Sequence, residues 1–156
     1  MKQFVCIIGL FVAACHTRQE RFIREASAFP EGYTGHWEVI LPSGGPRIFQ
    51  AGIRIEASGD SLLWGYFSQL VDTTNNRKLT CGPEVFQMPI WWDESIQVAK
   101  GNHGANQGYG FDVLRLLDGN TLQLNSPWLA ISCRGPGGFN SSQLVFSKVN
   151  SFRYKP

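Results

Sequence analysis

The sequence predicts an all-β protein, a single antiparallel β-barrel of about eight strands that follows an N-terminal signal and a tether. Three observations support this class. From about Gly32 onward, apolar and polar residues alternate with a period of two. The 17 glycines and 8 prolines of the 156-residue chain interrupt this pattern at short intervals. No segment after Gly32 carries the sustained apolar stripe that an amphipathic helix needs.

The N-terminal residues have the layout of a secretory signal peptide. Lys2 precedes an uncharged apolar run from Phe4 to Ala14, and the chain turns polar at His16. The run is shorter than the about 20 apolar residues of a membrane-spanning helix. A buried N-terminal strand is the alternative, but the flanks of the run fit export better. We therefore expect residues 1–14 to be removed, which leaves a mature chain of about 142 residues.

The end of this leader, Val12-Ala13-Ala14-Cys15, resembles the lipobox of bacterial lipoproteins. In that family, cleavage before the cysteine leaves an N-terminal cysteine that carries lipid. The resemblance implies that Cys15 is lipidated and that the protein is bound to the membrane of the cell envelope through this anchor. His16 follows, where the enterobacterial pattern for retention in the inner membrane has Asp, so the resemblance implies the outer membrane.

The remaining cysteines form an even set. Cys6 leaves with the leader and Cys15 takes the lipid, so Cys81 and Cys133 remain in an oxidising compartment. We expect a disulfide between them, and closing a loop of about 50 residues should stabilise the fold by roughly 4 kcal/mol. A metal pair or a redox couple is the alternative, and the spacing matches neither a zinc site nor Cys-x-x-Cys.

After the leader, the sequence divides into a tether, a barrel and a tail. Residues 15–31 show no strand alternation and end in the breaker cluster Phe29-Pro30-Glu31-Gly32, which is typical of a tether. A short helix over residues 20–28 is an alternative for part of it. We expect the barrel domain to span residues 32–150, with a tail over residues 151–156.

The clearest strand spans residues 49–57, where Phe, Ala and Ile occupy every second position. Ser58-Gly59-Asp60 predicts a tight turn from it into a strand from Ser61 to Phe67. An earlier strand begins near Trp37, and Asp118-Gly119-Asn120 predicts a later hairpin. The other predicted strands are Glu94 to Lys100, Gly110 to Leu117, Thr121 to Asn125, Trp128 to Cys133 and Gln143 to Val149. Val71 to Asp93 and Gly101 to Gly108 are expected to be long loops.

The residues Gly35-His36-Trp37 at the start of the first strand resemble the Gly-x-Trp signature of lipocalins and related calycin barrels. In that family the Trp plugs the closed end of the barrel, and a basic side chain from the last strand or just beyond lies across it. The resemblance implies that Trp37 closes the barrel and that Lys148 or Arg153 is the cation. It covers about 115 residues in layout but three in motif, so another antiparallel barrel and a β-sandwich remain alternatives.

Catalytic signals are weak. Gly59-Asp60-Ser61-Leu62 matches the GDSL signature of the SGNH hydrolases, which also need a late Asp-x-x-His to supply the general base. No His follows His103, and the motif lies between two alternating segments where a hairpin turn needs such residues. We therefore expect a turn and no enzyme.

The sequence also has no clear motif for binding a metal ion or a nucleic acid. His16, His36 and His103 have no metal-ligand spacing, and the adjacent Asp93 and Glu94 should face opposite sides of a strand. We expect neither a metal nor a cofactor. The net charge of +2 gives no electrostatic footprint for nucleic acid.

Aromatic residues supply the candidate sites. If the barrel keeps an open cavity, alternation predicts a lining of Trp64, Tyr66, Phe111, Val113 and Trp128, and a wholly packed interior is the alternative. Trp91 and Trp92 are adjacent, so one of them should point outward and contact a partner. A loop folded back over that Trp is the alternative.

Two functions follow from these sites. The first is a monomeric lipocalin-like module that binds a small hydrophobic ligand at the cell envelope. The second is a surface interaction protein or inhibitor, which binds an envelope protein and uses a filled barrel as the frame for its two long loops.

Overall fold

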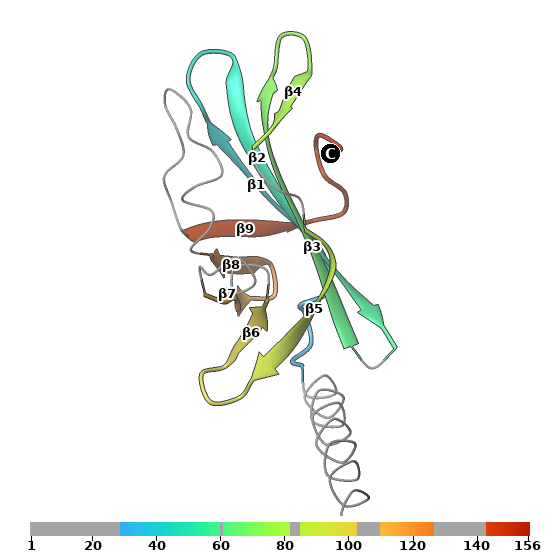
Figure 1. Ribbon diagram of the computed structural model, residues 1–156. Coiled ribbons are helices and arrows are strands. Elements are labelled where there is room, and N and C mark those ends of the chain that lie inside the picture. Colours follow the sequence, from blue (N-terminus) through green and yellow to red (C-terminus); the bar gives the residue numbers. More distant parts are fainter. Residues whose placement is uncertain (1–28, 60, 82–84, 103–109, 127–142) are drawn as a thin grey trace, which may run out of the picture.

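The computed structural model describes residues 29–59, 61–81, 85–102, 110–126 and 143–156. This part of the chain forms nine β-strands and no helix (Figure 1), which confirms the predicted all-β class. The strands are β1 (Gly35–Pro42), β2 (Arg47–Ser58), β3 (Ser61–Asp72), β4 (Arg77–Thr80), β5 (Val85–Asp93), β6 (Val98–Gly101), β7 (Asp112–Asp118), β8 (Thr121–Asn125) and β9 (Gln143–Val149).

Eight of the strands close into a ring. Their order is β1-β2-β3-β5-β6-β7-β8-β9, every neighbouring pair is antiparallel, and β9 returns to β1 through the pairs His36↔Val149 and Glu38↔Ser147. The ninth strand, β4, pairs with β3 opposite Gln69–Asp72, while β5 pairs with β3 opposite Leu62–Tyr66. β4 and β5 therefore share one place in the ring, and the predicted antiparallel barrel of about eight strands is confirmed.

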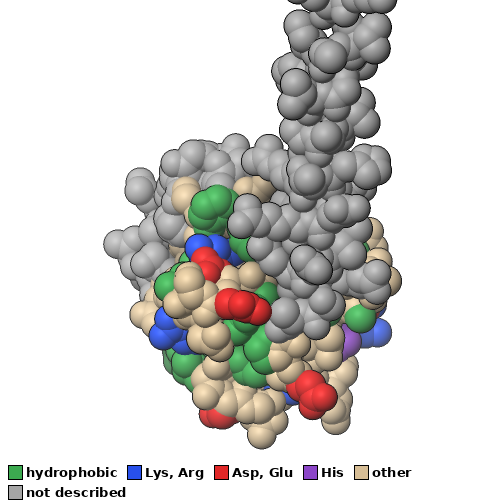
Figure 2. Space-filling model, turned by 90° about the horizontal axis from the view of Figure 1, so that it is seen from below, with side chains coloured by type: hydrophobic (Ala, Val, Ile, Leu, Met, Phe, Trp, Pro, Cys, Tyr) green, Lys and Arg blue, Asp and Glu red, His purple; other side chains and the backbone are tan. Residues whose placement is uncertain are grey.

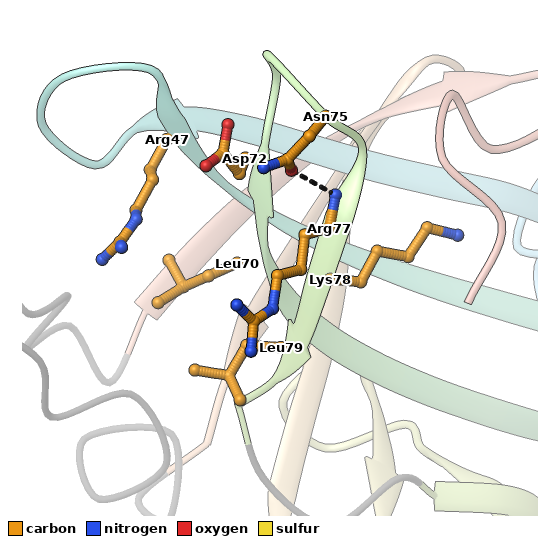
Figure 3. A pocket seen from close by; sticks show the side chains of 7 residues that line it. All are labelled: Arg47, Leu70, Asp72, Asn75, Arg77, Lys78 and Leu79. Carbon is orange, nitrogen blue, oxygen red and sulfur yellow. Dashed lines mark hydrogen bonds between the residues drawn. The ribbon is translucent and has the colours of Figure 1, made fainter.

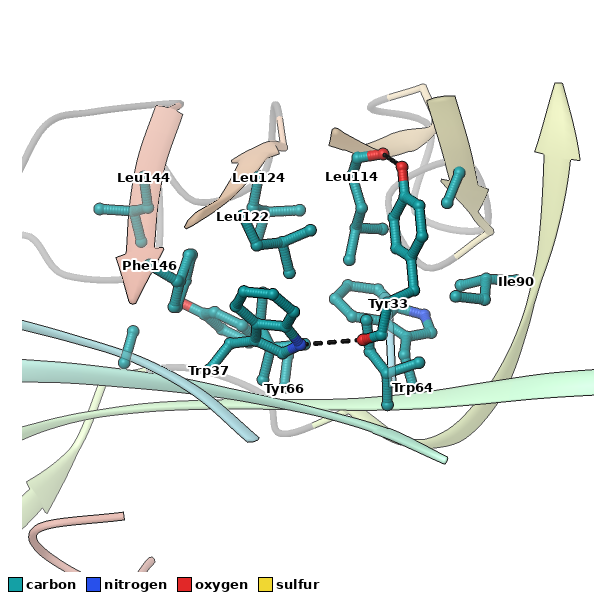
Figure 4. Packing of buried hydrophobic residues seen from close by; sticks show 14 of the residues in the cluster. Tyr33, Trp37, Trp64, Tyr66, Ile90, Leu114, Leu122, Leu124, Leu144 and Phe146 are labelled. Carbon is teal, nitrogen blue, oxygen red and sulfur yellow. Dashed lines mark hydrogen bonds between the residues drawn. The ribbon is translucent and has the colours of Figure 1, made fainter. Parts of the chain in front are cut away.

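Side chains on the inner face of the ring form the core. Because strand residues alternate between faces, cross-strand partners such as Ile53 and Tyr66, or Leu122 and Phe146, point into the barrel together. Figure 4 shows several of these side chains meeting between opposite walls. The fully buried large side chains include Trp37, Trp64, Tyr33, Tyr66, Phe146, Ile53, Ile55, Leu114, Leu122 and Leu124.

Both predicted tight turns connect paired strands, although Asp60 of the first turn lies outside the described residues. Gly59 follows β2 with a φ of 59°, a left-handed conformation that glycine adopts without steric cost. In the β7–β8 hairpin, the Asp118 Oδ1 accepts a hydrogen bond from the Asn120 N–H at 2.7 Å. That contact replaces a backbone bond in the turn, which explains why Asp is favoured there.

The prediction of one long loop over Val71 to Asp93 is wrong, because most of the segment forms β4 and β5. β4 has the sequence Arg-Lys-Leu-Thr, in which apolar and polar residues do not alternate, and its four side chains are all exposed. The sequence pattern therefore does not indicate a strand here. β5 contains Pro89, a residue that usually argues against a strand because it lacks an N–H. Pro89 nevertheless lies within β5, opposite Leu63 of β3. The pairing of β5 with β6 starts at the next residue, Ile90.

The strand predicted over Glu94 to Lys100 is half right. Residues 94–97 form the turn after β5, in which Gln97 has a φ of 54°, and β6 begins at Val98. The predicted leader, the tether as far as residue 28, the strand over Trp128 to Cys133 and most of the loop over Gly101 to Gly108 lie outside the described residues.

The C-terminal tail packs on the outer face of the barrel. The ring of Phe152 makes edge contacts with Phe67 at 4.9 Å and with His36 at 5.0 Å. Gly52 lies beneath them, and a Cβ added there would overlap Phe67 and lie 2.8 Å from Phe152. The absence of a side chain at Gly52 therefore lets the tail lie close to β1, β2 and β3.

Polar bonds hold the same tail further along. The Gln50 amide donates to the Tyr154 carbonyl at 3.0 Å and to the Glu38 carboxylate at 2.6 Å. The backbone N–H of Arg153 donates to the same carboxylate at 2.8 Å. Gln50 is fully buried on the outer face, so these bonds satisfy a polar group that the tail covers.

The described ranges contain no helix with the length and apolar character to cross a lipid bilayer.

Candidate functional site

Trp37 plugs one end of the barrel. Its indole is fully buried, and its Nε1–H donates to the carbonyl of Tyr33 at 2.9 Å (Figure 4). The Lys148 Nζ lies 5.0 Å from the indole centroid and donates to the carbonyl of Gly32 at 3.1 Å. One cation therefore sits on the aromatic face and also ties β9 to the segment that enters β1.

Of the two cations that the sequence offered for this position, Lys148 reaches the indole. The Arg153 guanidinium lies 5.8 Å from the ring of Tyr154 instead, in the tail that covers the outer face. The position of Lys148 also explains why the Gly-x-Trp signature begins with glycine. Gly35 has a φ of 130°, and a Cβ there would lie 3.0 Å from the Lys148 Cε.

The chain enters this closed end through an aromatic cluster. Phe29 packs against Tyr33 at 5.7 Å and Trp92 at 5.9 Å, so the last part of the predicted tether is packed onto the barrel. The Tyr33 hydroxyl donates to the carbonyl of Leu114 and accepts from the N–H of Leu116. Burial raises the pKa of Tyr33, which keeps the hydroxyl protonated as a donor.

The two adjacent tryptophans predicted to bind a partner have different environments. Trp92 belongs to the inner cluster and is 7% exposed. Trp91 faces outward, since it pairs with Lys100 on the opposite side of β5 and β6 from the core. The expectation that one of the two points outward holds for Trp91, and Trp92 lies in the core.

Trp64 and Tyr66 lie on the inner face, as the lining prediction requires. Each is 1% exposed, and their ring centroids are 6.4 Å apart. The Trp64 indole lies against Gly101, where an added Cβ would approach its Nε1 to 3.0 Å. Within the described ranges this Nε1–H has no hydrogen-bond acceptor. A buried donor without an acceptor costs about 1–3 kcal/mol.

Phe111 and Val113 were predicted to line the interior, and the structure places both on the outside. Phe111 is 47% exposed, while Asp112 and Leu114 are the buried residues that alternate with Val113. The prediction failed because the inward position is taken by a carboxylate, which contacts the hydroxyl of Ser126. A shift of one residue along a strand reverses every face. Trp128 lies outside the described residues.

Phe111 and Val113 instead join Trp91 and Lys100 in an outer aromatic patch. Trp91 and Phe111 make a T-shaped contact at 5.4 Å, and the Lys100 Nζ lies 5.9 Å from the Phe111 centroid. Lys100 also pairs with Asp93 at 2.6 Å. The hydrogen bonds from Lys100 and from Ser95 lower the pKa of Asp93 to about 2.

A hollow of about 300 Å³ lies at the end of the barrel opposite Trp37. Figure 3 shows the residues that line this mouth hollow: Arg47, Leu70, Asp72, Asn75, Arg77, Lys78 and Leu79. The register places Arg47, Asp72 and Arg77 side by side across β2, β3 and β4. Leu70 and Leu79 pair one layer further into the barrel, and Leu79 is 65% exposed.

The mouth hollow continues the inner face of the barrel. Phe49, which belongs to the core, pairs with Leu70, and Leu70 pairs with Leu79 on the same face. Sequence alternation does not predict this site, because the β4 sequence Arg-Lys-Leu-Thr does not alternate. The signal for Arg47 was present, since it continues the alternation of residues 49–57 by one step toward the end of the strand.

A second hollow, of about 440 Å³, lies at the closed end. It separates the entering segment from the β2–β3 hairpin and is lined by Phe29, Pro30, Glu31, Gly32, Tyr33, Thr34, Ala57, Gly59, Ser61 and Leu62. Figure 2 shows the molecule from below, where apolar side chains are interspersed with acidic and basic ones. The view shows no concentration of one charge sign.

The described ranges contain no group of three or more His, Cys, Asp or Glu side chains that could hold a metal ion. Cys81 is buried at the edge of the core, and its Sγ lies 3.9 Å from the carbonyl oxygen of Leu79. No disulfide joins two described residues, and Cys133 lies outside them, so the pairing of Cys81 with Cys133 stays a prediction.

The strand order and the Trp37–Lys148 contact are compatible with a lipocalin-like fold. Comparison of the chain with protein-family models found no match, and comparisons with curated proteins and with solved structures found no significant match.

Proposed function

We propose that this protein is a lipocalin-like module that binds a small hydrophobic ligand at the open end of its barrel. The observation that carries the proposal is Leu79, a large apolar side chain that stays 65% exposed on the inner face beside the mouth hollow. The opposite end is filled by Trp37 and Lys148. A volume of about 300 Å³ lies at the lower limit of typical ligand pockets.

A further observation supports ligand binding. The apolar inner face runs without interruption from Phe49 through Leu70 to Leu79, so a chain-like molecule would find hydrocarbon contacts along it.

Binding of oleic acid to the purified mature chain, measured by calorimetry below the fatty acid's micelle concentration, tests the proposal. Leu79→Ser should weaken binding about tenfold, since a buried Leu side chain contributes about 1.5–3 kcal/mol. Ile96→Ser is the matched control, because Ile96 is 50% exposed in the β5–β6 turn at the other end of the barrel. Equal affinity of the two variants, or no binding by the unchanged protein, would contradict the proposal.

We also propose that Cys15 carries the lipid that anchors the protein in the cell envelope. The support is the sequence Val12-Ala13-Ala14-Cys15 after an apolar leader. Phe29 joins the closed end of the barrel, so the anchor would connect to the molecule at the end opposite the mouth hollow. Cell fractionation of Cys15→Ser should find the protein free of lipid and released from the membrane. An acylated, membrane-bound variant would refute the anchor.

We also propose a disulfide between Cys81 and Cys133, because an exported protein reaches an oxidising compartment in which disulfides form. Peptide mapping without reduction should recover the two cysteines in one linked fragment. Free thiols at both positions would exclude the pairing.

A second candidate function is the binding of an envelope protein through the outer aromatic patch. Its support is Phe111, which is 47% exposed against Trp91 on the outside of the barrel. Exposed aromatic side chains beside a cation are enriched at protein interfaces. Cross-linking in cells should join a partner to the unchanged protein and lose it in Phe111→Ser, whereas Leu117→Ser, which alters another exposed apolar residue, should retain it.

A further inference from the structure

The rim of the mouth hollow presents two arginine side chains to the space above the leucines. Arg47 begins β2, Arg77 begins β4, and both are in register with Asp72 at the end of β3. In Figure 3 both guanidinium groups lie on the same side of the sheet as Leu70 and Leu79. The hollow therefore combines a hydrocarbon floor with a cationic edge.

Neither arginine is neutralised by a salt bridge in the described part of the chain. The ion pairs found there join Arg54 to Glu56 and Lys100 to Asp93. An exposed guanidinium keeps its five N–H donors for solvent or for a ligand. Two such groups at one rim form a site for an anion, because the Arg fork matches the oxygens of a carboxylate or a phosphate.

Asp72 lies between the arginines, but its carboxylate is engaged by the turn that follows. The Oδ1 accepts hydrogen bonds from the Thr74 N–H at 2.9 Å and from the Thr74 hydroxyl at 2.5 Å. These bonds, together with the charge of Arg47, lower the pKa of Asp72. The carboxylate thus remains ionised and fixes the β3–β4 turn, and the rim keeps an excess of one positive charge from these three residues.

Lys78 adds no charge to the inner side of the rim. Its ammonium group contacts the carbonyl of Lys155 in the C-terminal tail, and Figure 3 shows it on the other side of β4 from Arg77. Adjacent residues of a strand face opposite ways, which explains this arrangement. The ammonium group of Lys78 therefore points away from the two guanidinium groups.

We propose that the mouth hollow selects an anionic amphiphile, with the charged head between Arg47 and Arg77 and the acyl chain against Leu70 and Leu79. The inference rests on the proposed function and adds the chemistry of the head group. A free inorganic anion would make no use of the exposed Leu79, and a neutral lipid would make no use of the two arginines. The shared chemistry is thus a carboxylate or phosphate joined to a hydrocarbon chain.

Calorimetric titrations of the full mature chain with four probes test this specificity. The probes are oleic acid, oleoyl-lysophosphatidic acid, oleyl alcohol and inorganic phosphate. We expect the two anionic amphiphiles to bind at least tenfold tighter than oleyl alcohol, and inorganic phosphate to show no measurable binding. The tighter of the two amphiphiles identifies the head group as carboxylate or phosphate.

Substitutions then assign the effect to the rim. Arg47→Gln combined with Arg77→Gln should lower the affinity for both anionic amphiphiles at least tenfold and leave oleyl alcohol unchanged. Arg115→Gln, which removes an exposed arginine of β7 outside the hollow, should retain the preference for the anions. Arg47 and Arg77 are exposed, so circular dichroism and thermal unfolding should match those of the unchanged protein.

The outcomes separate the two proposals. Binding of all three lipids with equal affinity would overturn the head-group inference and leave the ligand-binding function standing. No binding of any lipid would refute the function itself, and the inference with it. Equal loss of anion preference in Arg115→Gln and in the Arg47/Arg77 double variant would overturn the assignment to Arg47 and Arg77, since it would show a general charge effect.

Discussion

Lys148 lies across the indole face of Trp37, with its Nζ 5.0 Å from the ring centroid, and the same ammonium group donates to the carbonyl of Gly32. Three parts of the chain therefore meet at the closed end: β1, the last strand β9 and the segment that enters the barrel. The contact holds these parts together at the closed end, and the mouth hollow lies at the opposite end of the barrel.

Replacing Lys148 should weaken this closure. Lys148→Met keeps much of the hydrocarbon stem but removes the charge, and an exposed cation–π contact contributes about 0.5–1 kcal/mol. We expect urea denaturation to show a loss of about 1 kcal/mol in the free energy of unfolding. Lys78→Met is the control, because Lys78 contacts no aromatic ring among the described residues. Equal losses in the two variants would argue against a role of the indole contact.

Gly35 should tolerate no side chain. Its φ of 130° is unfavourable for any L-residue, and a Cβ would press on the Lys148 Cε at 3.0 Å. Gly35→Ala should therefore destabilise the protein by about 1–3 kcal/mol. Gly119→Ala provides the comparison, because a Cβ at Gly119 meets nothing within 4 Å. A thermal midpoint for Gly35→Ala within 1 °C of that for Gly119→Ala would contradict this explanation of the Gly-x-Trp motif (about 4–8 °C per kcal/mol is typical of small domains).

The outer tail should contribute to the stability of the barrel wall. Phe152→Ala removes the ring contacts with Phe67 and His36 and uncovers Gly52, so we expect a loss of about 1–3 kcal/mol in chemical denaturation. Phe111→Ala, which removes an exposed ring elsewhere on the barrel, should cost less than about 1 kcal/mol. A tail that is only loosely attached would give the two variants the same stability.

Asp93 should make the fold sensitive to acid. The hydrogen bond from Lys100 lowers its pKa to about 2 in the folded state, below the value of about 3.9 expected when the chain is unfolded. A lowered pKa means that the unfolded state takes up the proton first, so the stabilisation is present above about pH 4 and is lost as the pH falls toward 2. The difference in stability between the unchanged protein and Asp93→Asn should shrink across that window. A difference that is constant from pH 6 to pH 2 would show that the ion pair does not act on folding.

The sequence was sufficient for the ring of strands where alternation is regular and turns have specific residues. Residues 49–57 alternate without error, and Gly59 and Asp118 have the local chemistry that a hairpin needs, so these elements were predictable. The strand alternation and the turns are local features, since each depends on neighbours within a few residues. The position of Trp37 followed instead from the resemblance of Gly35-His36-Trp37 to the Gly-x-Trp signature.

The features that sequence alternation did not predict depend on contacts between separate segments of the chain. Asp112 points inward because Ser126 of another segment contacts its carboxylate, and this reversed the expected faces of Phe111 and Val113. β4 is a strand because β3 offers it an edge, although its own side chains are all exposed. The mouth hollow is hard to predict for the same reason, since four of its seven lining residues come from β4 and from the turn before it.

The central claim is that the barrel binds an apolar molecule at its open mouth, above Leu70 and Leu79. Nuclear magnetic resonance of the mature chain, titrated with oleic acid, tests it most directly, because every backbone amide reports its own surroundings. We expect the largest shifts at Arg47, Leu70, Arg77 and Leu79, and none at Gly35 or Trp37. Shifts confined to Trp91 and Phe111, or no shifts at all, would contradict the claim.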